Sequence, residues 1–302
     1  MAYVSVRGVD HYIEWITDGS GVSPTRPQNS QKPVMVFIHG WAGSTRYWRQ
    51  TALALSHLFD CLLYDMRGFG RSHLPRPVPE NVAGLGYSLE SYADDLAELL
   101  DALNLDRVLI NAHSTGASIA TVFVNRWVGR CQAMILTCSG VFEYNKLAFQ
   151  AFHAVSRYVV AFRPRWFLQI PGLDRLFMVR FLSQPIMASA YREFLEDFVD
   201  ADGESALGTV YTAVSEKAAM EMPEEFRKLT VPTLLVSGEC DQIIPVKLGQ
   251  QAVSFNQEVT HVVIPKTGHF PMLEDSETYL AEVSRFLESI VLTGVSDRPG
   301  VV

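Results

Sequence analysis

Six short stretches of this chain are almost wholly apolar, and none is longer than five residues. They lie at 34–38, 61–64, 108–110, 133–137, 233–236 and 262–264. Strands without a polar side are buried on both faces, which is typical of a parallel sheet covered by helices. Helical patterns fall between them, over 88–103 with Ser88 at the expected N-cap, over 115–128 and over 275–292. This alternation predicts an α/β fold with a doubly wound, mostly parallel sheet.

Two regions lie outside the alternation. Residues 2–9 and 11–17 alternate like strands and predict an opening hairpin that turns at Gly8-Val9-Asp10. The segment 141–226 has helical patterns without a buried strand, and it holds fifteen of the thirty-three aromatic residues. We interpret it as an inserted helical cap between two parts of one core domain, 1–140 and 227–302. Its aromatic residues could equally form only a small core of the cap itself.

The composition limits the kind of protein further. The 302 residues are 48% hydrophobic, enough for a large core, and their net charge of −8 disfavours binding to nucleic acid. The four scattered cysteines form neither a disulfide framework nor a metal-ligand motif. The first fifteen residues do not resemble a signal peptide, and no run reaches the roughly 18 apolar residues of a membrane span. We therefore expect a cytoplasmic protein that binds no metal, cofactor or nucleic acid.

The strongest motif is the segment 111–117, NAHSTGA, between an apolar stretch and a helical pattern rich in small residues. It matches the nucleophile-elbow pattern G-x-S-x-G, with Ala112 in the first glycine position and Gly116 in the second. Larger side chains at these two positions would strike the neighbouring strand and helix. The motif predicts that Ser114 projects its hydroxyl from a strained backbone as a nucleophile. The alternative is a serine that only caps a helix.

Two later motifs offer the base and the orienting acid that a serine hydroxyl needs. Asp241 follows the stretch 233–236, and His269 follows 262–264. Both are therefore expected beside Ser114, at the edge where the carboxyl ends of parallel strands meet. Their chain order is also that of hydrolases with a nucleophile elbow. Three other acids are less suitable as the orienting acid, because of their position in the chain or their expected exposure on a helix: Asp65, Asp95 and Asp197.

The loop after the first apolar stretch reads FIHGWAGS at 37–44. Acyl chemistry creates an oxyanion that must meet preorganised N–H donors. We expect these donors to be the backbone amides of Thr115, which follows the nucleophile, and of Trp41. Gly40 lets the main chain approach closely, and His39 is expected to shape the loop through hydrogen bonds.

Five segments together resemble the α/β-hydrolase fold superfamily, in its capped serine-hydrolase branch of esterases and lactonases. They are HGWAGS, YDMRGFGRS (64–72), AHSTGA, SGECDQIIP and TGHFPMLED. The resemblance implies a catalytic triad of Ser114, Asp241 and His269 and an oxyanion hole from Trp41 and Thr115. It also implies structural roles for three further residues: Asp65, Arg67 and Glu274.

Two departures from the family pattern matter. Ala112 replaces the first glycine of the elbow, which other members tolerate. The nucleophile position holds Ser114 and not an aspartate, so the chain does not resemble the dehalogenases and epoxide hydrolases of the superfamily.

The leading hypothesis is a serine hydrolase that cleaves carboxylic esters or lactones of small to medium apolar substrates through an acyl-enzyme. The same residues could hydrolyse carbon–carbon bonds or transfer acyl groups, because fold and triad do not separate these reactions. A ligand-sensing receptor on the same fold is the non-enzyme alternative. The sequence does not predict the oligomeric state.

A last alternative concerns the cap surface. Five arginines of the cap alternate with aromatic and aliphatic residues between 157 and 181: Arg157, Arg163, Arg165, Arg175 and Arg180. Basic residues on an aromatic surface can dock on anionic lipid. The competing and favoured interpretation is that the arginines face solvent while the aromatic residues line the pocket.

Overall fold

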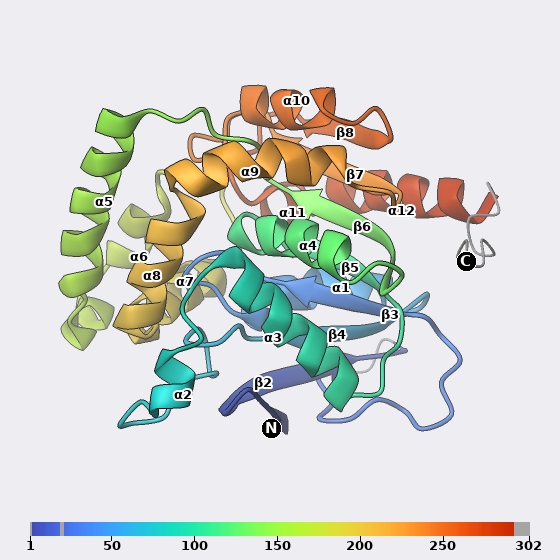
Figure 1. Cartoon of the computed structure of the whole chain (residues 1–302), viewed down its shortest axis with the longest axis horizontal. Coiled ribbons are helices and arrows are strands. Elements are labelled where there is room, and N and C mark those ends of the chain that lie inside the picture. The colour runs from blue at the N-terminus through green and yellow to red at the C-terminus, as the bar shows by residue number, and fades with distance from the viewer. Residues whose placement is uncertain (1, 19–20, 293–302) are drawn as a thin grey trace.

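The computed structural model describes residues 2–18 and 21–292 and has an eight-stranded sheet at its centre (Figure 1). The strands are β1 (Ala2–Val6), β2 (Val9–Ile16), β3 (Val34–Ile38), β4 (Asp60–Tyr64), β5 (Val108–His113), β6 (Cys131–Thr137), β7 (Thr233–Gly238) and β8 (Val259–Ile264). Their order is β1-β2-β4-β3-β5-β6-β7-β8. β2 runs antiparallel to β1 and β4, and all pairs from β4 to β8 are parallel. The predicted α/β fold class is confirmed.

Helices cover both faces of the sheet and bury two separate apolar layers. One layer includes α3 (Leu89–Ala102) and α4 (Thr115–Arg126), and the other includes α1 (Arg49–Leu55) and α12 (Ser276–Leu292). The remaining short elements of this core are η1 (Thr45–Trp48), α2 (Glu80–Ala83), α10 (Val246–Ser254) and α11 (Pro271–Glu274). Ser88 caps α3 as expected, because its hydroxyl accepts a hydrogen bond from the amide of Ser91. Among the described residues, no helix is both long and apolar enough to cross a bilayer.

The segment 141–226 is helical and contains no strand, as its sequence pattern predicted. Its elements are α5 (Lys146–Ala161), η2 (Arg165–Gln169), α6 (Leu173–Met178), α7 (Ala188–Asp200), α8 (Gly203–Ala213) and α9 (Glu216–Arg227). α5 forms the outer left edge of the molecule in Figure 1, while α9 returns over the sheet beside α4. The side chain of Asn125 on α4 donates to the backbone oxygen of Glu225 on α9 at 2.8 Å. The division into core and cap remains a prediction.

Two details differ from the sequence-based expectations. The hairpin turns one residue earlier, at Arg7 and Gly8, which both have positive φ, so that Val6 pairs with Val9. The strand expected at 262–264 is the longer β8 at the edge of the sheet, where Thr260 and Val263 are exposed. A short apolar run does not reveal whether a strand has one neighbour or two.

Candidate active site

The turn from β5 to α4 has the geometry of a nucleophile elbow. Ser114 occupies the single position between them with φ of +54°, a backbone conformation that is strained for a serine. A Cβ atom on Gly116 would lie 2.4 Å from the carbonyl oxygen of His39, and one on Gly40 would lie 3.1 Å from the Cβ of Ser114. The two glycines therefore allow the elbow to touch the loop 39–44, which we call the oxyanion loop after the role expected of it.

The structure brings Ser114, His269 and Asp241 together in one hydrogen-bonded line. Nε2 of His269 lies 3.1 Å from Oγ of Ser114, and Nδ1 lies 2.7 Å from Oδ2 of Asp241. Asp241 is buried, and its other oxygen accepts the amides of Ile243 at 2.7 Å and Ile244 at 3.0 Å. These bonds fix the orientation of the carboxylate, so that it can orient the imidazole with Nε2 toward the serine.

The loop that carries His269 is held from both sides. The amide of His269 donates to the carbonyl oxygen of Phe181 at 2.7 Å. The carboxylate of Glu274 accepts the amides of Gly268 at 2.9 Å and of Ser183 at 2.6 Å. Glu274 thus has the structural position that the family resemblance implied, and it joins the His269 loop to the segment that follows α6.

A buried network that the sequence analysis missed supports the same histidine. The amide of Gly40 donates to the hydroxyl of Tyr47 at 2.5 Å, and this hydroxyl lies 3.1 Å from Nδ1 of His113. Nε2 of His113 lies 2.8 Å from the carbonyl oxygen of His269. Burial holds the pKa of His113 well below its usual value, so the ring is neutral. The geometry therefore assigns its proton to Nε2, which donates to His269.

One sequence signal points to this network. His113 is a polar residue at the end of a buried strand, directly before the elbow serine, and a buried histidine needs partners for both nitrogens. Tyr47 carries no such signal, because nothing local to η1 shows that its hydroxyl reaches β5.

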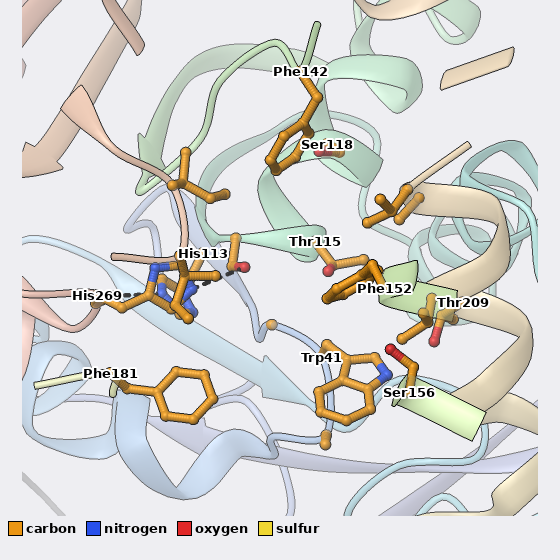
Figure 2. Close-up of a pocket in the computed structure, with 18 of the residues that line it drawn as sticks. Trp41, His113, Thr115, Ser118, Phe142, Phe152, Ser156, Phe181, Thr209 and His269 are labelled. Carbon is orange, nitrogen blue, oxygen red and sulfur yellow. Dashed lines mark hydrogen bonds between the residues drawn. The ribbon is translucent and has the colours of Figure 1, made fainter. Parts of the chain in front are cut away.

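The amides expected to bind an oxyanion lie beside Ser114 on the cavity wall. Thr115 begins α4, where amides have no partner within the helix. The amide of Trp41 makes no hydrogen bond within the described residues, and its indole donates to the carbonyl oxygen of Ala206 on α8 at 2.8 Å. His39 shapes this loop as expected, since its Nε2 accepts the amide of Met66 at 2.8 Å. Figure 2 shows Trp41 and Thr115 beside His113 and His269.

The acids set aside in the sequence analysis support the scaffold. Asp65 accepts the amide of Thr45 at 2.7 Å, and Arg67 pairs with Asp95 at 2.8 Å between buried side chains. The expected exposure of Asp95 and Asp197 on their helices is wrong, because both are buried. Their helices pack these positions against loops from distant parts of the chain, which the periodicity of one helix cannot reveal.

Asp197 on α7 lies behind the oxyanion loop. Its Oδ2 accepts a hydrogen bond from the hydroxyl of Ser44 at 2.5 Å, and its other oxygen lies 3.5 Å from the guanidinium of Arg46. Burial raises its pKa to about 7, because desolvation outweighs these two interactions. The pair with Ser44 connects the helical segment to the loop of Trp41.

A cavity of about 580 Å³ opens in front of Ser114. Its floor is the elbow and the His269 loop, and its far wall comes from α5, α8 and α9. The lining is mostly apolar, with Phe142, Phe152 and Phe181 placed around the opening in Figure 2. Hydroxyl groups of Ser156 and Thr209 lie on the wall opposite His269. The arrangement suits a mainly apolar molecule that carries one reactive polar group.

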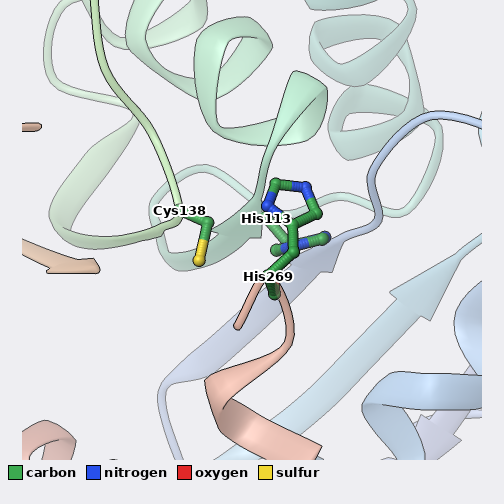
Figure 3. A group of neighbouring side chains, drawn as sticks. All are labelled: His113, Cys138 and His269. Carbon is green, nitrogen blue, oxygen red and sulfur yellow. The ribbon is translucent and has the colours of Figure 1, made fainter. Parts of the chain in front are cut away.

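The fold gathers three side chains with potential metal-ligand atoms, although the sequence has no metal motif. Nitrogen or sulfur atoms of His113, Cys138 and His269 lie within 4.8 Å of one another (Figure 3). Both ring nitrogens of each histidine already have hydrogen-bond partners, and burial raises the pKa of the Cys138 thiol well above its usual value. A metal requires a thiolate and free imidazole nitrogens, so these residues do not fit one.

Comparison with known proteins agrees with this geometry. A family model described as alpha/beta hydrolase fold matches residues 33–276. A non-heme haloperoxidase of Rhodococcus erythropolis is 25% identical over 280 residues, which cover 86% of this chain and 93% of that protein. A bifunctional esterase/perhydrolase of Acinetobacter calcoaceticus is 24% identical over 306 residues, which cover 96% of this chain and 100% of that protein. The solved structure of an esterase from Exiguobacterium antarcticum has a TM-score of 0.75 at 19% identity, over 95% of this chain and 99% of that one.

The chain therefore belongs to the α/β-hydrolase fold family, as the resemblance of its motifs implied. Its relatives and its fold together support the function of a hydrolase.

Proposed function

We propose that this protein is a serine hydrolase that cleaves carboxylic esters or lactones of small to medium apolar substrates. The observation that carries the proposal is the line from Asp241 through His269 to Ser114 at the head of an apolar cavity of about 580 Å³. The esterase/perhydrolase relative adds support for ester chemistry.

The reaction proceeds in two halves. Nε2 of His269 takes the proton of Ser114 while Oγ attacks the substrate carbonyl carbon, and the carbonyl oxygen becomes an oxyanion that the amides of Trp41 and Thr115 receive. The protonated His269 then gives its proton to the leaving alkoxide as the C–O bond breaks. Water, deprotonated by the same histidine, attacks the acyl-enzyme; the bond from the acyl carbon to Oγ breaks, Oγ takes the proton back from His269, and the acid is released.

The proposal is tested by labelling the active site. A fluorophosphonate probe should modify Ser114 in the wild-type protein, and mass spectrometry should locate the adduct on the peptide that contains 111–117. Ser118 lines the same cavity on α4 and serves as a matched control, since Ser118→Ala should leave labelling intact. Labelling that persists in Ser114→Ala would contradict the assignment.

Three assays separate the open alternatives. Release of p-nitrophenol from esters with saturation kinetics supports hydrolysis, and an added alcohol or amine acceptor reveals acyl transfer. A β-diketone substrate tests carbon–carbon cleavage. Tight ligand binding without turnover in a wild-type protein that resists the probe would instead favour a receptor.

A further inference from the structure

The helix α5 has an unusual surface for a helix on the outside of a protein. Only Ser156 and Val160 of its sixteen residues are buried. Its outward stripe consists of Leu147, Val155 and Tyr158 and is continued just past the helix by Phe162, with side chains 61–78% exposed. These positions follow the helical repeat, so they share one side of the helix. Polar residues normally occupy that side, and a helix that is apolar all round is normally covered.

Exposed apolar side chains also continue along the chain after α5. Trp166 on η2 lies 6.4 Å from the ring of Phe162, and Leu176 and Val179 are exposed on and just after α6. Of the nineteen large hydrophobic residues that are exposed in the described parts of the chain, eleven lie between 144 and 179. We call the surface of Leu147, Val155, Tyr158, Phe162, Trp166, Leu176 and Val179 the cap face. Apolar surface this concentrated marks an interaction site.

The charge around the cap face is opposite to that of the whole molecule. The segment 144–180 has six basic side chains and one acidic one, whereas the chain as a whole has a net charge of −8. Arg157 and Arg175 are exposed and have no carboxylate partner among the described residues. The guanidinium of Arg157 lies 5.5 Å above the ring of Tyr158. The cap face therefore combines exposed aromatic rings with unpaired positive charge.

We propose that the cap face docks on the surface of an anionic phospholipid bilayer. Aromatic and aliphatic side chains enter the interfacial region, and the unpaired Arg157 and Arg175 contact lipid phosphates. A second copy of the chain fits less well, because a twofold interface would bring two patches of positive charge together. The lipid offers both negative charge and an apolar interior.

Docking there would place the cavity at the membrane. Val155 belongs to the cap face and also lines the cavity, together with its neighbours Phe152 and Val159 on the same helix. An apolar substrate dissolved in the bilayer would then reach Ser114 without crossing bulk water. The proposal goes beyond the hydrolytic function and does not depend on it, since docking is a binding property.

The test measures partition of the whole protein onto sucrose-loaded vesicles. We expect at least tenfold stronger binding to vesicles of phosphatidylcholine with 30% phosphatidylglycerol than to phosphatidylcholine alone, with binding that weakens as salt rises. Phe162→Ser/Trp166→Ser should reduce the partition at least tenfold. Arg157→Gln/Arg175→Gln should reduce it about thirtyfold and flatten the salt dependence, at about 1 kcal/mol per basic residue.

Two matched controls lie far from the cap face. Val128→Ser changes an exposed valine after α4, and Arg107→Gln changes an exposed arginine before β5; neither should alter the partition. None of the altered cap-face residues in these variants lines the cavity, so circular dichroism and probe labelling should match the wild type. Absence of vesicle binding overturns the proposal, as does binding that the cap-face variants leave unchanged. Concentration-dependent dimers that Phe162→Ser/Trp166→Ser dissociates, without vesicle binding, would assign the face to a second copy.

Discussion

The two walls of the cavity are built in different ways. The wall on the sheet side consists of loops after β3, β5, β7 and β8, and its polar atoms are joined by hydrogen bonds of 2.5–3.1 Å through Gly40, Tyr47, His113 and His269. The wall on the helical side contributes mainly apolar side chains, and it is continuous with an exposed apolar surface. The comparison suggests that one wall sets the reaction and the other selects the substrate.

The largest loss of activity is expected when Ser114, on the sheet-side wall, is replaced. Ser114→Ala should lower kcat for any accepted ester by roughly three orders of magnitude or more, because no other group in the line can form the acyl-enzyme. The melting temperature should change little, because alanine keeps the strained backbone at position 114 and removes only the hydroxyl that contacts His269. Stopped assays at high enzyme concentration measure the residual rate, and a variant with more than about a tenth of the wild-type rate would refute the role.

The triad should also act as a unit. His269→Ala is expected to cost about as much as Ser114→Ala, and the double variant should lose little more. Losses that add up in this cycle would show that the two side chains work independently.

A smaller loss of rate is expected from the buried network. Tyr47→Phe removes the hydroxyl that joins Gly40 to His113, and leaving buried polar atoms without partners costs about 1–3 kcal/mol. If the network positions the oxyanion loop and His269, kcat should fall about tenfold or more while KM changes little. Tyr279→Phe is the matched control, since its buried hydroxyl bonds Asn111 and Thr137 below the site. That variant should lower stability and leave kcat unchanged.

The helical wall should control chain length. Each substrate methylene buried against it contributes about 0.8 kcal/mol, so two or three added carbons should raise kcat/KM about tenfold or more until the cavity is full. Met222→Trp on α9 fills part of the cavity and should move the optimum to shorter chains. Met220→Trp changes an exposed position of the same helix and should not. A flat chain-length profile would remove the case for substrate selection by this wall.

The smallest expected effect is on the pH dependence of stability, through the contact of Asp197 on the helical wall with Ser44 on the sheet-side wall. The pKa of Asp197 is raised to about 7 in the folded protein, so the folded state binds its proton more tightly than the unfolded state does. Stability from this group is fully present at low pH and is lost as pH rises from about 4 through 7, of which about 1.4 kcal/mol falls between pH 6 and pH 8. Asp197→Asn cannot ionise, and chemical denaturation at the two values should show a correspondingly smaller change. An equal change in both proteins would show that Asp197 does not titrate in this range.

Much of the sheet could be predicted because each strand carries its own signal. An apolar run such as 34–38 is buried wherever it lies in a covered sheet, and the residue after it must then lie at the carboxyl edge. That argument alone placed Ser114, Asp241 and His269 on one edge, and the structure joins them. The apolar runs did not distinguish the edge strand β8 from an inner strand, because the number of neighbouring strands is not a property of the strand's own sequence.

The aromatic residues of the helical segment show where such reasoning ends. Sequence patterns left them in a small core of the cap, in the pocket or on the surface, and the structure divides them: Phe198 is buried, Phe181 lines the cavity, and Phe162 and Trp166 are exposed. Helical periodicity tells which residues share a side, but the side that is covered depends on what packs there.

By itself, the sequence determined the sheet, the elbow and the edge on which Ser114, Asp241 and His269 gather, since these follow from local patterns of burial and backbone conformation. Only the tertiary structure decided that Tyr47 and His113 connect the oxyanion loop to His269 and that Asp197 is buried behind this loop. It also decided that α5 presents an apolar stripe to the outside. Each of these depends on contacts between residues far apart in the chain, and such contacts exist only once the elements have packed.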